Sequence, residues 1–374
     1  MSTLHLSREV KVYVQWDAQI WEIPVLDGFS FSQSTNTSEV TLKEMANSSN
    51  VSRRGRKIFN DSLSPAEWSF STYARPYIDS TKHHAIEEVL WAMMVGAPLT
   101  AYDSEPDWST ASSTTASLVT GTSDLQISFA SSNVLTMPTA AIYFKLPGND
   151  GSGGGDIWYK LDKAAVNECA LEFDIDGITT INWSGMASTL AEVATANIPD
   201  VSTLEIASSK LELTSNFIRN RLTQLTLSSE DGLPLLAAPN GYSLVLTGGS
   251  VTISNNVEHV TPASLGIVNV PLDHTLGTRT VSGSFTCYLD NAGTASADLF
   301  EDLQSNSSNV ANSFDLKFLV GGSSAPNMEV HCAKAMLEIP SHSVEDVISM
   351  EVNFHGMGTD IAATNEVTVK YIGA

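Results

Sequence analysis

The chain has 374 residues, of which 42% are hydrophobic and only 16% charged, and its 42 Asp and Glu against 19 Lys and Arg give a formal net charge of −23. This apolar content is sufficient for folded domains and excludes a wholly disordered chain. The scarcity of Lys and Arg disfavours a nucleic-acid-binding protein, because such proteins hold phosphates with basic side chains.

Neither a membrane-spanning segment nor a secretion signal is expected. The longest apolar run, residues 89–99, is shorter than the roughly 20 residues that a spanning helix needs, so we expect no membrane insertion. The N-terminus lacks the basic and apolar regions of a signal peptide, which predicts a protein that stays where it is made. Cys169, Cys287 and Cys332 are widely spaced and odd in number. We expect buried free thiols, with one disulfide plus a leftover thiol as the alternative.

In chain order, most of the predicted elements are strands, because apolar and polar residues alternate with period two. The predicted strands are 9–16, 20–26, 125–129, 142–146, 157–161, 222–227, 348–354 and 366–371. Helical spacing of apolar residues occurs at His83–Gly96, where Ser80 or Thr81 is available as a cap, and less regularly at Thr294–Leu303. The sequence therefore predicts a mainly β fold with two helices.

Four blocks of sequence recur in the same order in the two halves of the chain. The matched blocks are 26–41 over 246–261, 68–73 over 283–288, 124–129 over 315–320, and 181–186 over 352–357. The last match continues without gaps from Lys163 and Lys334. A repeat of this length predicts an internal duplication, each copy carrying one of the two helices.

The duplication predicts two tandem domains, with the boundary in the Ser-, Thr- and Ala-rich stretch 191–215. We place the first domain at residues 1–200 and the second at 201–374. The extra chain of the first copy is expected at about 98–163. This insertion would contain the predicted hairpin 142–161, whose connecting loop is rich in glycine.

The residue patterns that could support chemistry are weak. The segment Gly148–Asp156 is rich in glycine and contains Asp150 and Asp156. It lacks the Lys and the following helix of a phosphate-binding loop, and the tandem copies of a calcium-binding repeat, so we expect a hairpin tip. Asp174 and Asp176 precede Gly177 at a predicted turn and do not indicate an acid–base pair.

The histidines likewise indicate no metal or catalytic site. His83 and His84 are adjacent and point in different directions, while His331 and Cys332 would lie on opposite faces of a strand. No zinc-binding spacing and no Gly-x-Ser-x-Gly nucleophile motif occurs in the sequence. The sequence therefore predicts no enzyme, no cofactor and no bound metal.

One basic cluster stands out in this acidic chain. Arg53, Arg54, Arg56 and Lys57 lie in the long loop 42–66 between two predicted strands. Binding of nucleic acid by one short run would oppose the large negative net charge. The alternatives are a solvated loop and a loop that docks on an acidic face of another copy of the chain, which we favour slightly.

The layout of each copy resembles the tail tube proteins of tailed bacteriophages. Each copy has an early hairpin, a long loop, a Ser-Phe-x-x-Tyr strand at 68–73 or 283–288, one helix, and a closing strand ending in Gly-Met. The segment Ser64–Pro76 is the part most similar to such proteins. The resemblance, which extends to the tube protein of type VI secretion, implies two tandem β-barrel or β-sandwich domains, each with a flanking helix.

The resemblance also implies a function. A chain with two such units is similar to the double-domain variant, in which three subunits form a pseudo-hexameric ring and stacked rings form the tail tube. We therefore expect a non-enzymatic virion protein, assembled in the host cytoplasm, that contacts itself, the tape measure, the tail terminator and the baseplate or distal tail proteins. An acidic lumen would let DNA pass without specific binding. Alternation alone does not identify the lumen side, and the alternative is that the acidic residues lie on the outside of the tube.

The resemblance also implies that the loop at 42–66 contacts the neighbouring ring, which makes Arg53, Arg54, Arg56 and Lys57 candidate inter-ring contacts. The corresponding loop of the second copy, 262–282, lacks such a cluster and holds Asp273 and one Arg, Arg279. The alternatives are another tail or baseplate protein and a two-domain β-sandwich binding module such as an adhesin. An enzyme is the third alternative.

Overall fold

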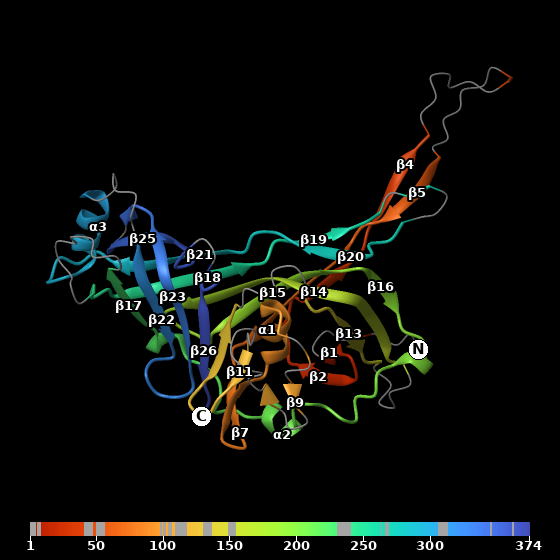
Figure 1. The fold of residues 1–374 in the computed structure, drawn as a ribbon, viewed down its shortest axis with the longest axis horizontal. Helices are drawn as coiled ribbons and strands as arrows, with labels where there is room; N and C mark the ends of the chain where they lie inside the picture. Colours follow the sequence, from red (N-terminus) through yellow and green to blue (C-terminus); the bar gives the residue numbers. More distant parts are fainter. Residues whose placement is uncertain are drawn as a thin grey trace.

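The fold is described from a computed structural model. The described residues are 5, 9–40, 48–49, 57–97, 99, 102–103, 107–108, 118–129, 137–148, 155–229, 241–262, 264–265, 269–305, 313–344, 346–360 and 363–374. The protein is mainly β, as the alternating pattern predicts, and most of its strands join one antiparallel sheet of 18 strands (Figure 1).

The first half of the chain contains a long series of strands and one buried helix. Its strands are β1 (Lys11–Trp16), β2 (Gln19–Ile23), β3 (Ser30–Ser32), β4 (Thr35–Glu39), β5 (Ile58–Leu63), β6 (Ala66–Tyr73), β7 (Pro76–Asp79), β8 (Lys82–Ala85), β9 (Tyr102–Asp103), β10 (Asp107–Trp108), β11 (Leu118–Thr120), β12 (Leu125–Ser128), β13 (Ala140–Leu146), β14 (Ile157–Asp174), β15 (Thr180–Ala187) and β16 (Thr189–Glu192). Its helix is α1 (Glu88–Val95).

The second half follows a connecting segment with short helical turns. That segment contains η4 (Thr195–Asn197), α2 (Ser208–Leu211) and η5 (Asn220–Leu222). The elements that follow are β17 (Gln224–Ser229), β18 (Leu246–Ser254), β19 (Val257–Val260), β20 (Asp273–Leu276), β21 (Thr280–Tyr288), α3 (Ser296–Ser305), β22 (Phe314–Val320), β23 (Asn327–Leu337), β24 (Ser341–Val344), β25 (Ile348–Gly356) and β26 (Thr368–Ile372).

The two predicted helices exist, but the first is shorter than predicted. His83 and His84 belong to β8, which pairs with β7, so α1 begins only at Glu88. Ser80 and Thr81 do not cap the helix, because they form the turn between these strands with φ of 45° and 80°. Every residue of α1 is buried, whereas α3 buries one face and matches its prediction closely.

The same order of paired strands occurs in both halves of the sheet. In the first half the order is β1–β13–β14–β15–β6–β3, and in the second it is β17–β22–β23–β25–β21–β18. In addition, β16 pairs with β14 as β26 pairs with β23. Each half also has a separate two-stranded arm. The first arm, β4–β5, follows β3, and the second arm, β19–β20, follows β18.

The register of the strands also repeats. Ser30 lies opposite Ser69 in β3–β6, and their matched residues Ser250 and Ser284 lie opposite each other in β18–β21. Where β13 meets β14 the register shifts after Ala140, and it shifts at the equivalent place where β22 meets β23. The first two matched blocks of sequence are therefore aligned correctly.

The last matched block is displaced by two residues. Trp68 lies opposite Gly185 in β6–β15, and Gly283 lies opposite Phe354 in β21–β25. Since Gly283 is the counterpart of Trp68, Phe354 is the counterpart of Gly185, and the ungapped match of 181–186 to 352–357 is wrong by two positions. A shift of two preserves which side chains face the core, so the alternating pattern cannot detect it.

The third matched block is also wrong. The segment 315–320 lies in β22, whose place in the sheet is that of β13, whereas 124–129 forms β12. Because short alternating strands resemble one another in sequence, similarity alone matched 124–129 to a strand that is not its structural counterpart. The hairpin 142–161 exists as predicted, with Ile142 opposite Leu161, but it belongs to the repeated part of the fold and not to the insertion.

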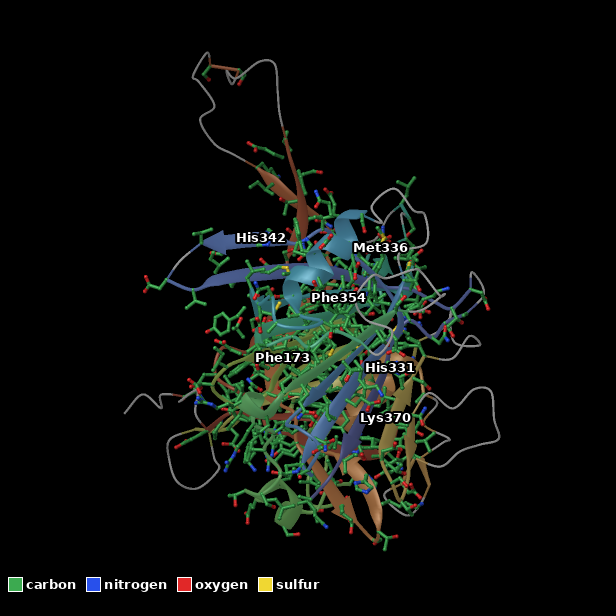
Figure 2. All side chains as sticks on the ribbon, turned by 90° about the vertical axis from the view of Figure 1, so that its left-hand side faces the viewer. Phe173, His331, Met336, His342, Phe354 and Lys370 are labelled. Atoms are coloured by element: carbon green, nitrogen blue, oxygen red, sulfur yellow. The ribbon has the colours of Figure 1, made fainter. Side chains whose placement is uncertain are left out.

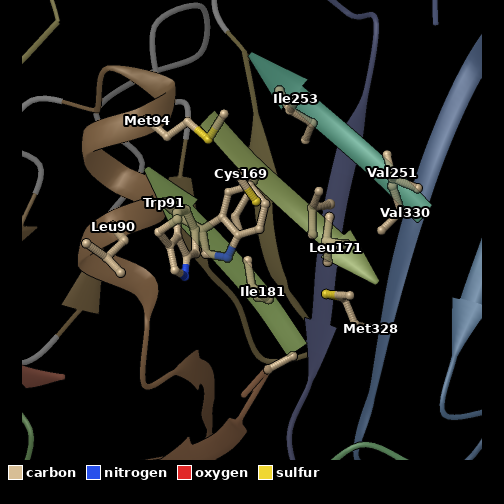
Figure 3. Packing of buried hydrophobic residues seen from close by; sticks show 14 of the residues in the cluster. Leu90, Trp91, Met94, Cys169, Leu171, Ile181, Val251, Ile253, Met328 and Val330 are labelled. Atoms are coloured by element: carbon tan, nitrogen blue, oxygen red, sulfur yellow. The ribbon is translucent and has the colours of Figure 1, made fainter. Parts of the chain in front are cut away.

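One hydrophobic core runs through both halves of the sheet. Trp91 of α1 packs near Cys169 and Leu171 of β14, which adjoin Val251 of β18 and Met328 of β23 (Figure 3). Hydrogen-bonded ladders β14–β18 and β12–β26 join the halves directly. The connecting segment packs on the first half, so the division at 200/201 stays a prediction.

Candidate channel face and contact surfaces

A continuous series of strands forms the middle of the large sheet. Its order is β3–β6–β15–β14–β18–β21–β25–β24, and we refer to it, with β14 counted from Ala165, as the central sheet. All of its residues are described. β3 and β24 lie at its two ends, and each pairs within the described chain with one neighbour only.

The two faces of the central sheet differ sharply, because side chains alternate along each strand. The inner face consists of buried apolar residues such as Trp68, Trp183 and Phe285, which belong to the core. The outer face consists mainly of Ser, Thr and Asn side chains, which are partly or fully exposed. Hydroxyl and amide groups in such rows can hydrogen-bond to water without carrying charge.

Among Asp, Glu, Lys and Arg residues, the central sheet carries only acidic ones, while its two histidines are His342 and His355. None of the 19 Lys and Arg residues of the chain lies on these strands. The outer face carries the carboxylates of Glu67, Glu168, Glu172, Asp174 and Glu351. The described basic residues lie on other strands, in loops and in the connecting segment. This surface therefore has no fixed cation with which a phosphate could pair.

The buried polar groups around α1 hold the helix against the strands. The His84 Nδ1 atom lies 3.0 Å from Glu88 Oε2, and the backbone N–H of Gly373 donates to His83 Nδ1 at 2.9 Å. Burial raises the pKa of Glu87 to about 7, although its carboxylate accepts a hydrogen bond from the backbone N–H of Arg75. These contacts bind α1 to neighbouring strands, so we assign His83 and His84 a structural role.

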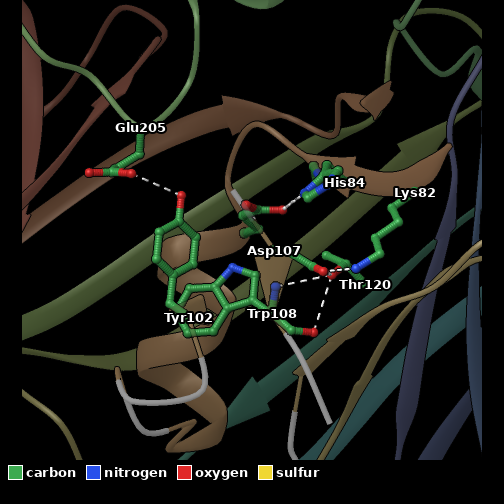
Figure 4. Close-up of polar contacts among 9 residues, drawn as sticks. Lys82, His84, Tyr102, Asp107, Trp108, Thr120 and Glu205 are labelled. Atoms are coloured by element: carbon green, nitrogen blue, oxygen red, sulfur yellow. Dashed lines mark hydrogen bonds and ion pairs between the residues drawn. The ribbon is translucent and has the colours of Figure 1, made fainter. Parts of the chain in front are cut away.

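A second set of polar contacts joins the segment after α1 to the connecting segment and to β8 (Figure 4). The Tyr102 hydroxyl donates to Glu205 at 3.1 Å, and Lys82 forms an ion pair with Asp107, which also accepts from Thr120. Each side chain is therefore engaged in a structural contact within the fold.

The glycine-rich motif behaves as a hairpin connection in its described part. Lys145 Nζ lies 2.8 Å from Asp156 Oδ2, and the backbone N–H of Gly148 donates to Asp156 Oδ1 at 3.1 Å. Asp150 lies outside the described residues. Asp174 ends β14 and Gly177 has φ of 110°, which confirms the predicted turn.

The three cysteines and His331 also occupy structural positions. Cys169, Cys287 and Cys332 are buried and free, which confirms the first expectation, and burial raises the pKa of each thiol. His331 Nε2 lies 2.9 Å from Asp315 on the opposite face to Cys332. Within the described ranges, no group of three or more His, Cys, Asp or Glu side chains is placed to hold a metal ion.

In the sequence, the basic cluster lies between β4 and β5, the two strands of the first arm, which projects from the body (Figure 1). Arg53, Arg54 and Arg56 lie outside the described residues. Lys57 is exposed before β5, with Nζ 5.3 Å from the centre of the Phe59 ring. Only Lys57 of the cluster is described, so the contact role of these four residues stays a prediction.

The single Arg of the second loop has a partner within the chain. Arg279 Nη1 lies 3.1 Å from Glu366, and the guanidinium stacks 3.9 Å from the centre of the Phe129 ring. This contact joins the second half to the first. Asp273 is exposed at the start of β20, where its Oδ1 atom accepts a hydrogen bond from the backbone N–H of His274 at 2.8 Å.

Comparison with known proteins decides the family. Residues 83–368 match the family model of the phage tail tube protein. The chain belongs to the phage tail tube family. Tail tube protein pb6 of Escherichia phage T5 is 26% identical over 377 residues, which cover 97% of this chain and 75% of pb6.

The family assignment confirms the resemblance drawn from the sequence. A tail tube protein is a structural component of the phage virion, and it assembles with copies of itself. Among the described helices, none is long and apolar enough to cross a membrane. The composition shows that the protein is acidic, but it does not show that a continuous set of strands lacks Lys and Arg. Those strands become neighbours only through pairing between distant parts of the sequence.

Proposed function

We propose that three copies of this tail tube protein close into a pseudo-hexameric ring and that stacked rings form the conduit for genome ejection. Each chain contributes two tube-type units, at residues 1–200 and 201–374. The repeated strand order and register support two equivalent units per chain. Stacking identical rings through head-to-tail contacts gives an open tube, whose length another tail component sets.

We further propose that the outer face of the central sheet lines the lumen. The observation that carries this assignment is the absence of all 19 Lys and Arg residues from its strands. DNA passing through the tube presents a dense row of phosphates, which bind wherever basic side chains are fixed. A surface of hydroxyl, amide and carboxylate groups gives those phosphates nothing to bind, so the DNA passes without specific contacts.

Closing the ring also explains the ends of the central sheet. A free strand edge presents unpaired N–H and C=O groups, which natural proteins cover or pair. Joining β24 of one copy to β3 of the next gives a closed barrel without free edges. Ring closure thus satisfies both ends of the sheet at once.

The remaining partners follow from the same role. The tube is expected to contact the tape measure inside it, the tail terminator at one end and the baseplate or distal tail proteins at the other, after assembly in the host cytoplasm. Arg53, Arg54, Arg56 and Lys57, which lie between β4 and β5 in the sequence, are proposed to contact the adjacent ring. Attraction to an acidic neighbouring surface would fix the relative rotation of the rings.

Negative-stain electron microscopy of the purified protein, together with native mass spectrometry of its soluble fraction, tests this function. Hollow tubes and three-subunit rings are the expected result. A persistent monomer that binds glycans would instead favour the binding module considered above.

A further inference from the structure

The second arm brings two imidazole side chains together. β19 and β20 pair in antiparallel register, with His259 directly opposite His274. The backbone N–H of Gly277 donates to the carbonyl oxygen of Asn256 at 2.9 Å, and hydrogen-bonded pairs alternate with non-hydrogen-bonded pairs along such a ladder. Three pairs further along, His259 and His274 therefore form a non-hydrogen-bonded pair, in which side chains come closest. Their ring centres are 5.9 Å apart.

The pair lies on the side of the arm that packs on the first half of the chain. Val257 and Leu276 share this side, because alternate residues of a strand point the same way, and both pack with Ala165 of β14. The His274 side chain is only 6% exposed. The two imidazoles are thus largely shielded from bulk water.

Three nitrogens of these rings lack partners. Among the described residues, neither ring nitrogen of His259 nor Nδ1 of His274 has a hydrogen-bond partner, although all three atoms are buried. Asp273 Oδ1 lies 3.2 Å from His274 Nδ1 without the alignment of a hydrogen bond, and it accepts from the backbone N–H of His274 instead. Buried polar atoms without partners are rare in native proteins, and an ion is one of the groups that satisfies them.

The surroundings keep His259 neutral at pH 7. Burial, and next the neighbouring His274, hold the pKa of His259 below its ordinary value, although Asp273 and the nearby backbone of Lys163 act in the opposite direction. The Lys163 ammonium group donates to the carbonyl oxygen of Leu272 at 3.0 Å. A neutral imidazole has a nitrogen lone pair that can bind a metal ion, whereas a protonated imidazole has none.

We propose that His259 and His274 together bind one divalent transition metal ion, such as Zn²⁺, on the second arm. Imidazole nitrogens suit Zn²⁺, Cu²⁺ and Ni²⁺, whereas Mg²⁺ and Ca²⁺ take oxygen ligands. Metal–nitrogen bonds of about 2.0–2.1 Å place two imidazole centres on a tetrahedral ion roughly 5 Å apart. The observed 5.9 Å requires the rings to approach by about 1 Å, which side-chain rotation supplies.

The site is open, with two ligands from the protein. Within the described ranges, no third His, Cys, Asp or Glu is placed with the pair to hold an ion, so water fills the remaining positions. Asp273 is placed as a positioning residue, because a carboxylate beside the second nitrogen of a ligating imidazole fixes its tautomer and orientation. That arrangement leaves His274 Nε2 to bind the ion. The sequence predicted no metal site because only the pairing of β19 with β20 brings the two histidines together.

Isothermal titration calorimetry with ZnCl₂ tests the site, using the full chain without an affinity tag after removal of bound metal with EDTA. The parent protein should bind one Zn²⁺ per chain, and MgCl₂ should give no binding. His259→Ala and His274→Ala should each lower the association constant by at least about tenfold, and Asp273→Asn should lower it by less.

Two controls separate this site from imidazoles elsewhere on the surface. His355 also lies beside a carboxylate, with Nε2 3.2 Å from Glu338 Oε1, but its cross-strand neighbours are Ser282 and Met336. His342 is exposed on β24, in the hairpin that runs out from the body (Figure 2). His355→Ala and His342→Ala should leave the affinity for Zn²⁺ unchanged.

A second measurement uses the parent protein alone, so it does not depend on the folding of any variant. Electron paramagnetic resonance of the protein with one equivalent of Cu²⁺ should show splitting from two imidazole nitrogens. A parent that binds no Zn²⁺, or a Cu²⁺ spectrum with one nitrogen, would overturn the proposal. Zn²⁺ binding that survives His259→Ala or His274→Ala, or that is lost in either control, would overturn it as well.

Discussion

Two glycines opposite aromatic rings offer the sharpest test of the repeated register. A methyl group on Gly185 would lie 2.1 Å from the carbonyl oxygen of Ala165 and 2.6 Å from the Trp68 ring. A methyl group on Gly283 would lie 2.1 Å from the carbonyl oxygen of Ser250 and 2.7 Å from the Phe354 ring. Because backbone oxygens of paired strands cannot move freely, Gly185→Ala and Gly283→Ala must distort the ladder.

The expected cost follows from these contacts. Overpacking a well-packed site costs about 1–3 kcal/mol, and weakening a ladder hydrogen bond adds about 1 kcal/mol. We therefore expect each variant to lose about 3 kcal/mol of unfolding free energy. Gly248→Ala is the matched control on β18, because its methyl group would meet nothing closer than 3.5 Å. It should change stability by less than about 1 kcal/mol.

Urea unfolding of the unassembled subunit, followed by tryptophan fluorescence, measures these differences. The slopes should stay constant while the midpoints of both variants fall by similar amounts. A Gly283→Ala variant that unfolds with the Gly248→Ala control would refute the equivalence of the two aromatic–glycine pairs. A urea midpoint that falls strongly in Gly185→Ala but not in Gly283→Ala would refute this equivalence as well.

Three further predictions concern the channel, a buried carboxyl group and the arm. Ser284→Lys would place a cation on the outer face of the central sheet, so tubes should assemble while DNA ejection slows by about tenfold, and an unchanged ejection rate would remove this face from the lumen. Burial raises the folded pKa of Glu87 above its ordinary 4.5 to about 7. The folded state then binds more protons in this interval, so stability falls as pH rises from about 4.5 to about 7. Glu87→Gln should flatten that fall in urea unfolding at pH 5 and pH 8, and an unaltered pH dependence would exclude this group as its source. Replacing Arg53, Arg54, Arg56 and Lys57 by Ser should weaken ring stacking more than ring closure. Sedimentation would separate tubes from rings, and equal polymerisation of the variant and the parent would exclude the docking role.

Local patterns predicted the individual elements well where a strand or helix buries one side. The alternation at 9–16 and 20–26 gave β1 and β2, and the spacing of Leu299 and Leu303 gave α3. The start of α1 was missed because Ser80 and Thr81 form a turn between strands, although both are good helix caps. Tertiary pairing of β7 with β8 overrode the helical spacing there.

The candidate channel face was not predicted from the sequence. Few Lys and Arg residues disfavoured nucleic-acid binding and the family resemblance implied a conduit, but alternation along one strand does not identify that strand's neighbours. Glu172 and Ser250 face the same side because β14 pairs with β18, across a large distance in the sequence.

Electron cryomicroscopy of the assembled tube provides the most direct measurement of how the chain encloses its channel. We predict three subunits in each ring, with the hydroxyl and carboxylate side chains of the central sheet facing the hollow axis. Six subunits in each ring, or a wall formed by strands that bear Lys317 and Lys370, would contradict the proposed assembly.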